Sequence, residues 1–152
     1  MTTIVLGIGD FAVRAGPVEY VCHGLGSCMA VFLYDKTSSI TAGAHIPVPS
    51  ARGGSPIVGA DIIFNQMSKQ LTDAGCTMRS LEAKITGGAK INRGHTMTVG
   101  EQNIYAVYQQ LQALGIPIAS IDVGGHNPRT ARFSSSTATI QISIPEKGNY
   151  QI

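Results

Sequence analysis

The chain has 152 residues, of which 43% are hydrophobic and 13% charged, and its formal net charge is +2. This composition predicts one globular domain over residues 1–152 and excludes a disordered chain, while the scattered lysines and arginines argue against a nucleic-acid-binding surface. No stretch of about 18 apolar residues and no signal-peptide pattern occurs, so we expect a cytoplasmic protein without membrane insertion.

The first third of the chain predicts β-structure. Runs of β-branched and apolar residues indicate strands at 3–8 and 18–22. Residues 28–34 and 40–46 are apolar runs separated by turn-forming residues at 35–38, and they predict a hairpin with a loop of about four residues. Pro47 stands where the second of these strands should end.

The remaining two thirds predict two helices among further strands. Apolar residues recur at intervals of three and four over 57–74 and 100–114, and glycines follow both segments. Strands are expected at 81–86, 118–123, 130–133 and 137–144. Many strands with only two main helices predict an α+β fold, a single-domain layered sandwich of mixed and antiparallel strands.

Cys28 is the first candidate for chemistry. It follows Gly24-Leu25-Gly26-Ser27, a glycine-rich loop whose N–H groups can converge on a developing negative charge. With a loop at 35–38, Cys28 lies directly opposite His45, with Cβ atoms about 5 Å apart, and a slip of one residue would separate the two faces. Such a pair favours a thiolate at neutral pH, with a lowered pKa. A lone cysteine is more often a small buried hydrophobe, and spacing alone leaves both interpretations open.

Other polar residues favour structural roles. The histidines His23, His95 and His126 lack zinc-motif spacing with Cys22, so we expect no metal site. Asp122 and Arg129 are candidates for an ion pair or for substrate binding. Cys76 follows a helix-ending glycine and is expected to be structural. Without C-x-x-C spacing, all three cysteines suit reduced thiols.

Glycine pairs at 87–88 and 124–125 predict either sharp strand ends or the walls of a substrate cleft. The shorter Gly-x-Gly segments at 7–9 and 24–26 lack the third glycine of a dinucleotide-binding loop. They are therefore interpreted as turns.

Several segments together resemble one known family. Gly24-Leu-Gly-Ser-Cys-Met-Ala-Val-Phe-Leu-Tyr-Asp35 is followed by Gly43-Ala-His45-Ile-Pro-Val-Pro49, and then by the glycine pairs and residues 99–104. In order and spacing this pattern is similar to the chemoreceptor glutamine deamidases (CheD proteins), over nearly the whole chain. The resemblance implies a fold akin to the cytotoxic-necrotizing-factor and YfiH types of cysteine hydrolase.

The resemblance also implies an activity, namely hydrolysis of glutamine side-chain amides on chemotaxis receptors to glutamate and ammonia. Cys28 would attack the amide carbon, His45 would move protons, and Gly26 and Ser27 would belong to the loop that holds the oxyanion and substrate. No metal or organic cofactor is implied. A chemotaxis phosphatase of the CheC type is an implied partner, and the alternative function is an adaptor that binds such partners or receptors without turnover.

Position 22 departs from the family pattern. A threonine usually stands six residues before the nucleophile and orients the histidine, whereas this chain has Cys22, whose thiol is a weaker hydrogen-bonding group. Three outcomes are open: Cys22 replaces the threonine, a backbone carbonyl orients His45 instead, or catalysis is impaired. A Cys22–Cys28 disulfide that blocks the nucleophile is a further alternative, disfavoured in a reducing cytoplasm.

Overall fold

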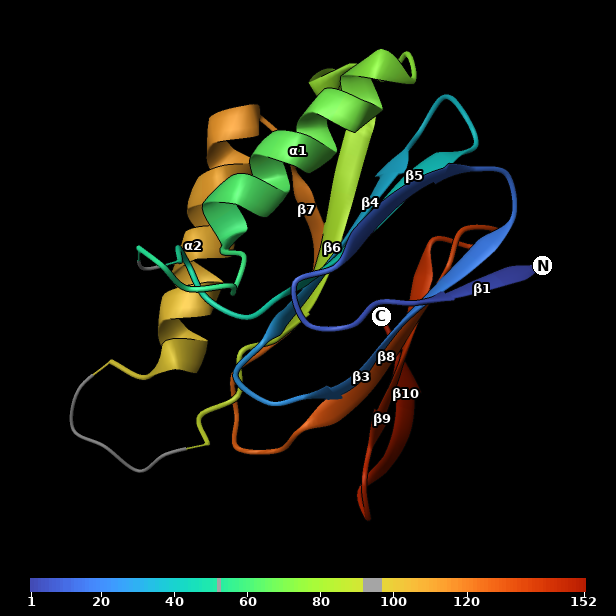
Figure 1. Cartoon of the computed structure of the whole chain (residues 1–152). Coiled ribbons are helices and arrows are strands. Elements are labelled where there is room, and N and C mark those ends of the chain that lie inside the picture. The colour runs from blue at the N-terminus through green and yellow to red at the C-terminus, as the bar shows by residue number, and fades with distance from the viewer. Residues whose placement is uncertain (52, 92–96) are drawn as a thin grey trace.

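Two five-stranded sheets pack face to face, and two helices cover the outer face of one of them (Figure 1). The computed structural model describes residues 1–51, 53–91 and 97–152. The first sheet has the order β1-β3-β8-β9-β10 and the second β2-β5-β4-β6-β7. The strands are β1 (Thr2–Val5), β2 (Phe11–Ala15), β3 (Val18–Leu25), β4 (Met29–Asp35), β5 (Ile40–Ile46), β6 (Leu81–Gly87), β7 (Ile118–Val123), β8 (Arg129–Ser134), β9 (Thr139–Ile144) and β10 (Gly148–Gln151).

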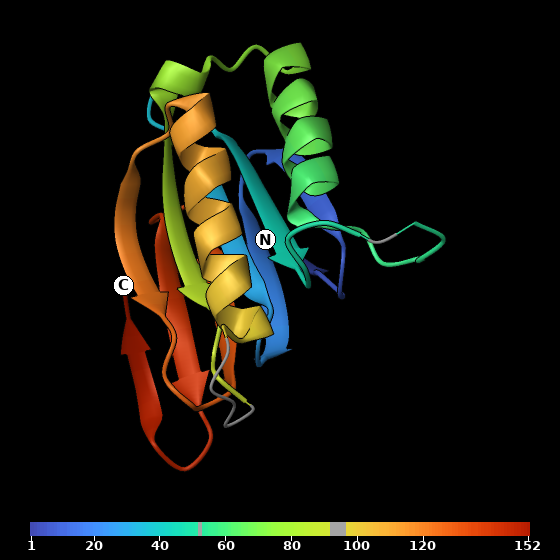
Figure 2. The same cartoon turned by 90° about the vertical axis from the view of Figure 1, so that its left-hand side faces the viewer.

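The helices are α1 (Ala60–Asp73) and α2 (Val99–Leu114), with a 3₁₀ turn, η1, at Met78–Ser80. They lie on the same side of the second sheet (Figure 2). The Thr98 hydroxyl accepts the Glu101 N–H at the start of α2, and Gly115, at φ 72°, ends it in the left-handed conformation that glycine adopts without a Cβ penalty. The start of α2 is therefore set by a local cap.

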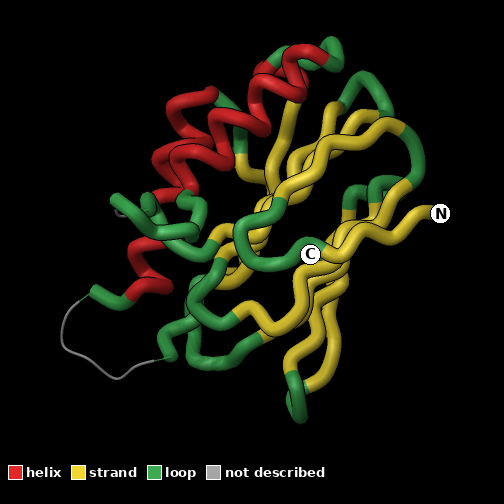
Figure 3. The backbone as a smooth tube through the Cα atoms, in the orientation of Figure 1, coloured by secondary structure: helices red, strands yellow, loops and turns green. Residues whose placement is uncertain are grey.

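Strand β4 lies in the middle of the molecule, between two hydrophobic cores. Met29, Val31 and Leu33 point toward the helices, whereas Ala30 and Phe32 point into the space between the sheets. There Phe32 stacks on Phe133 of β8, with ring centroids 5.1 Å apart. Burial on both faces explains why β4 reads as an unbroken apolar run rather than an alternating one. Figure 3 shows the strands as two layers with the helices outside.

The predicted α+β architecture of layered, mixed sheets with two main helices is confirmed. Strands β2 and β10 were not predicted. The short β10 segment is polar and exposed, so it carries no alternating pattern, and β2 is a pentapeptide interrupted by Arg14. The predicted strand at 18–22 continues to Leu25, and the helix predicted from residue 57 begins at Ala60.

The predicted β4–β5 hairpin is confirmed, but its predicted register is wrong. Tyr34 pairs with Thr41 instead of Ser39, and His45 pairs with Ala30 instead of Cys28. Tyr34 and Thr41 are the last pair of the hairpin, and in the turn beyond them the Asp35 carboxylate accepts hydrogen bonds from the N–H and the hydroxyl of Thr37. Since the shift is two residues, it leaves every side chain on its predicted face.

Candidate functional site

The hairpin places Cys28 and His45 on the same face of the second sheet. His45 lies opposite Ala30, a residue of the core between the sheets, and Cys28 packs against that same core just before β4 begins. The two positions are therefore diagonal rather than directly opposed. Diagonal neighbours have Cα atoms about 7–8 Å apart, a distance that an imidazole ring can span toward a thiol.

His45 is buried and its ring is held by the backbone of a neighbouring segment. Its Nδ1 lies 2.9 Å from the carbonyl oxygen of Leu6, and its own N–H and C=O bond to Asp10 and Gly9. A carbonyl oxygen only accepts hydrogen bonds, so Nδ1 carries the proton that fills this one. In the neutral ring, Nε2 then presents its lone pair and is free to accept a proton.

Cys22 lies in the core between the sheets and is fully buried. No hydrogen bond joins it to His45 within the described part of the chain, and the Leu6 carbonyl occupies the position of the orienting group. Burial, and secondarily the nearby Cys28, raises the pKa of the Cys22 thiol to about 12. Cys22 is therefore a neutral thiol near the site, and of the three outcomes considered for position 22 the geometry matches the second, a backbone carbonyl.

Cys28 is half-buried, and burial raises the pKa of its thiol. The predicted lowering of this pKa is therefore wrong, because desolvation favours the neutral sulfur. A neutral thiol needs a base during attack rather than before it, and histidine is the side chain that most often acts as such a base. All three cysteines are free thiols.

The loop before Cys28 is fixed through its carbonyl groups. The oxygens of Gly26 and Cys28 accept hydrogen bonds from the backbone of Ala89 and Gly88, at 2.8 and 2.9 Å. The Ser27 oxygen accepts one from the Asn103 side chain, at 2.9 Å. Within the described residues, the N–H groups of Ser27 and Cys28 make no hydrogen bond. The loop therefore leaves two backbone donors free beside the sulfur, which is the requirement for binding an oxyanion.

Two glycines allow these close contacts. A Cβ on Gly87 would lie 2.2 Å from the Cys28 carbonyl oxygen, and one on Gly100 would lie 2.4 Å from that of Ala89. Only a residue without a Cβ permits such an approach. Gly87, the first glycine of the pair at 87–88, therefore ends strand β6 and also forms part of the wall around the Cys28 loop.

The remaining sequence candidates lie in structural contacts. Arg129 is buried and bonds to the carboxylate of Asp122 at 3.1 Å, and Asp122 also accepts a hydrogen bond from the Tyr150 hydroxyl at 2.7 Å. Cys76 is buried beside Asp35. Among the described residues no group of three or more His, Cys, Asp or Glu side chains is placed to hold a metal ion, and His95 lies outside those residues.

Two contacts of the candidate site were missed in the sequence. The Leu6 carbonyl had no signal, because every residue carries a carbonyl group. Asn103 had one: it stands four residues before Val107 on the buried face of α2, where a polar side chain is unusual.

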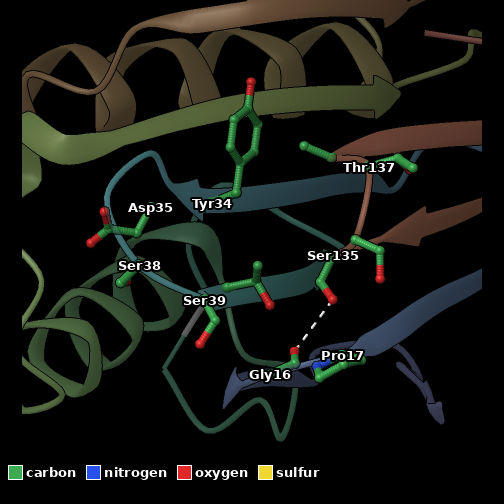
Figure 4. A pocket seen from close by; sticks show the side chains of 11 residues that line it. Gly16, Pro17, Tyr34, Asp35, Ser38, Ser39, Ser135 and Thr137 are labelled. Atoms are coloured by element: carbon green, nitrogen blue, oxygen red, sulfur yellow. Dashed lines mark hydrogen bonds between the residues drawn. The ribbon is translucent and has the colours of Figure 1, made fainter.

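One hydroxyl-lined cavity lies far from Cys28. It has a volume of about 350 Å³ and lies at the other end of β4, beside Tyr34, Ser39 and Thr137 (Figure 4). Ser135, which also lines it, donates a hydrogen bond to the Gly16 carbonyl, drawn in Figure 4, so this hydroxyl closes a turn. A second cavity, of about 360 Å³, begins at Val48 and reaches α2, next to the Pro47 carbonyl that Asn103 binds. Of the two, the second lies nearer the site.

Within the described residues, the thiol of Cys28 and the imidazole of His45 share one face of a sheet beside backbone N–H groups that make no hydrogen bond. Cysteine-dependent acyl-transfer enzymes use groups of these kinds. Comparison with known proteins gives the family. The sequence model described as CheD chemotactic sensory transduction matches residues 50–144. The chain belongs to the CheD family.

Relatives match over almost the full chain. The chemoreceptor glutamine deamidase CheD of Thermotoga maritima is 34% identical over 140 residues, covering 91% of this chain and 89% of that protein. The probable chemoreceptor glutamine deamidase CheD of Clostridium kluyveri is 35% identical over 157 residues, covering 98% and 97%. The chemoreceptor glutamine deamidase CheD of Halalkalibacterium halodurans is 32% identical, with 98% of each chain covered.

Two solved structures are similar in part. The hypothetical protein YfiH of Bacillus licheniformis matches with a TM-score of 0.49 at 15% identity, over 74% of this chain and 50% of its own. Protein NMB0706 of Neisseria meningitidis matches with a TM-score of 0.43 at 14% identity, over 76% and 52%. This chain thus spans about half the length of each. None of the helices in the described residues is both long and apolar enough to cross a membrane.

Proposed function

We propose that this protein is a cytoplasmic glutamine deamidase that converts glutamine side chains of chemotaxis receptors to glutamate. The family membership and the names of the relatives support the substrate class. One observation carries the chemistry: the Leu6 carbonyl holds Nδ1 of His45, and Nε2 has no hydrogen-bond partner among the described residues, on the face where Cys28 lies. Residues 1–152 would act as a single catalytic domain.

In the first half of the proposed reaction, sulfur attacks the substrate amide. Nε2 of His45 takes the Sγ proton while Sγ of Cys28 bonds to the carboxamide carbon, whose carbonyl electrons move onto oxygen. The free N–H groups of the loop bind that oxyanion. His45 then donates its proton to the amide nitrogen, the C–N bond breaks, and ammonia leaves a thioester on Cys28.

In the second half, water hydrolyses the thioester. Nε2 of His45 takes a proton from water as its oxygen bonds to the thioester carbon. The tetrahedral intermediate uses the same backbone donors and collapses by breaking the C–S bond, and the sulfur regains its proton from the imidazolium. The products are a glutamate side chain and the free thiol, and the residues named so far complete the cycle without a metal or organic cofactor.

A second candidate is an adaptor that binds receptors, or a chemotaxis phosphatase of the CheC type, with little or no turnover. Position 22 is the observation that favours it, since Cys22 makes no hydrogen bond to His45 within the described residues. The Leu6 carbonyl supplies an orienting contact without the side chain of residue 22, and the deamidase is therefore the better-supported proposal.

The test is deamidation of a purified cytoplasmic fragment of a chemoreceptor. Wild type, Cys28→Ala and His45→Ala are incubated with the fragment, and mass spectrometry of its peptides detects conversion of glutamine to glutamate together with released ammonia. We expect conversion by the wild type and none by either variant. Receptor binding without conversion by the wild type would favour the adaptor.

A further inference from the structure

Asn103 is fully buried on α2, and its side chain joins two segments that are distant in sequence. Its amide nitrogen donates to the Ser27 carbonyl and to the Pro47 carbonyl, both at 2.9 Å. Both partners are acceptors only, so the NH₂ end of the amide must face them and both of its hydrogens are used. Asn103 thereby ties the loop that ends at Cys28 to the segment that follows β5.

The bond to Ser27 determines the direction of one particular N–H group. The peptide unit between Ser27 and Cys28 is planar and trans, so its C=O and N–H point in opposite directions. With the Ser27 oxygen held against Asn103, the Cys28 N–H points away from α2 and finds no partner in the described residues. This N–H group belongs to the same residue as the sulfur atom.

Within the described residues, only the NH₂ end of the Asn103 amide is hydrogen-bonded. The Oδ1 atom of Asn103 is buried and has no hydrogen-bond partner among the described residues. A buried acceptor without a partner costs about 1–3 kcal/mol, but an apolar residue here would leave the Ser27 and Pro47 carbonyls without the donor that Asn103 supplies.

We propose that Asn103 is a positioning residue that fixes the Cys28 N–H as an oxyanion donor, and this inference rests on the proposed deamidase function. The hydrogen bond to Pro47 holds the amide itself in one orientation. Asn103 does not touch the reacting atoms, because the peptide unit that it binds lies between.

If Asn103 positions the Cys28 N–H, two reactions of Cys28 should respond differently to Asn103→Ala. Deamidation passes through an oxyanion, whereas alkylation by iodoacetamide requires the sulfur but develops no oxyanion. We expect kcat for deamidation to fall about 10- to 100-fold with KM little changed, since one donor or a displacement of about 1 Å has effects of this order. The rate at which iodoacetamide labels Cys28 should stay close to that of the wild type, with buried Cys76 as a slow internal reference.

Val107→Ala is the matched control for lost stability. Val107 is fully buried one turn further along α2, in the core between the helices and the second sheet, and is an apolar residue that makes no side-chain hydrogen bond to the Cys28 loop. Both variants are compared at a temperature where circular dichroism shows them folded. Asn103→Ser, which retains a shorter polar side chain, is used in the same two assays if the alanine variant does not fold.

Two results would overturn the inference: kcat of Asn103→Ala no lower than that of Val107→Ala, or a fall in labelling as large as the fall in deamidation. Cys28→Ala, assayed in parallel, distinguishes a failure of the Asn103 inference from a failure of the proposed deamidase function. If Cys28→Ala is inactive, either of those results removes only the role of Asn103. If it retains activity, or if the wild type leaves the receptor glutamines intact, both proposals fail.

Discussion

Replacing Gly87 by alanine should damage the site more than the fold. The new Cβ would lie 2.2 Å from the Cys28 carbonyl oxygen, whereas ordinary contacts begin near 3.4 Å, so the two segments must separate by about 1 Å. Both sides of this contact are backbone, and no side chain can rotate out of the way. A displacement of about 1 Å at reacting groups can lower kcat by about 10²-fold.

The stability cost has a separate origin and a separate control. Gly87 has φ +113°, and an alanine in such a sparsely populated region costs about 1–3 kcal/mol. Gly148 has a similar φ of +106° but open space around its Cβ position, so Gly148→Ala reproduces the backbone strain without the collision.

Urea unfolding and steady-state deamidation of a receptor fragment separate the two effects. We expect Gly87→Ala to lose more stability than Gly148→Ala, and only Gly87→Ala to lose kcat by one to two orders of magnitude. Equal kcat values in the two variants would refute the claim that Gly87 fixes the position of the nucleophile loop.

Two further predictions concern residues 22 and 35. Cys22→Thr should preserve or raise deamidation, because the Leu6 carbonyl already holds His45 and a hydroxyl is a stronger hydrogen-bonding group than a thiol. A large loss in kcat would show that the Cys22 thiol has a specific role. Burial acts to raise the pKa of Asp35, but hydrogen bonds from Thr37, Cys76 and Ser80 outweigh it and hold this pKa well below its usual range. The carboxylate therefore stabilises the fold above pH about 4, and this contribution is lost as the pH falls through the lowered pKa. Urea unfolding at pH 7 should show Asp35→Asn to be less stable than the wild type by about 1–3 kcal/mol, with a smaller gap at pH 3; a gap independent of pH would contradict this assignment.

The β4–β5 hairpin shows what could be predicted from the sequence and what could not. Two apolar runs around a turn were enough to predict β4 and β5, and the period of two fixed which faces Cys28 and His45 share, since the error of two residues leaves the faces unchanged. The register itself was not predicted, and the Asp35 side chain at the turn bonds not only to nearby Thr37 but also to Ser80, which is 45 residues away.

The sequence by itself determined the α+β class, both helices, the loop ahead of Cys28 and the family to which the chain is similar, because these depend on local periodicity, turn chemistry and linear motifs. Only the tertiary structure decided what surrounds the sulfur. The Leu6 carbonyl, the Gly87 backbone and the Asn103 amide reach the site from three distant segments, and the burial that raises the pKa of the Cys28 thiol comes from the packing of two sheets. Such contacts leave little or no local pattern, since their energy comes from groups that meet only when the chain is folded.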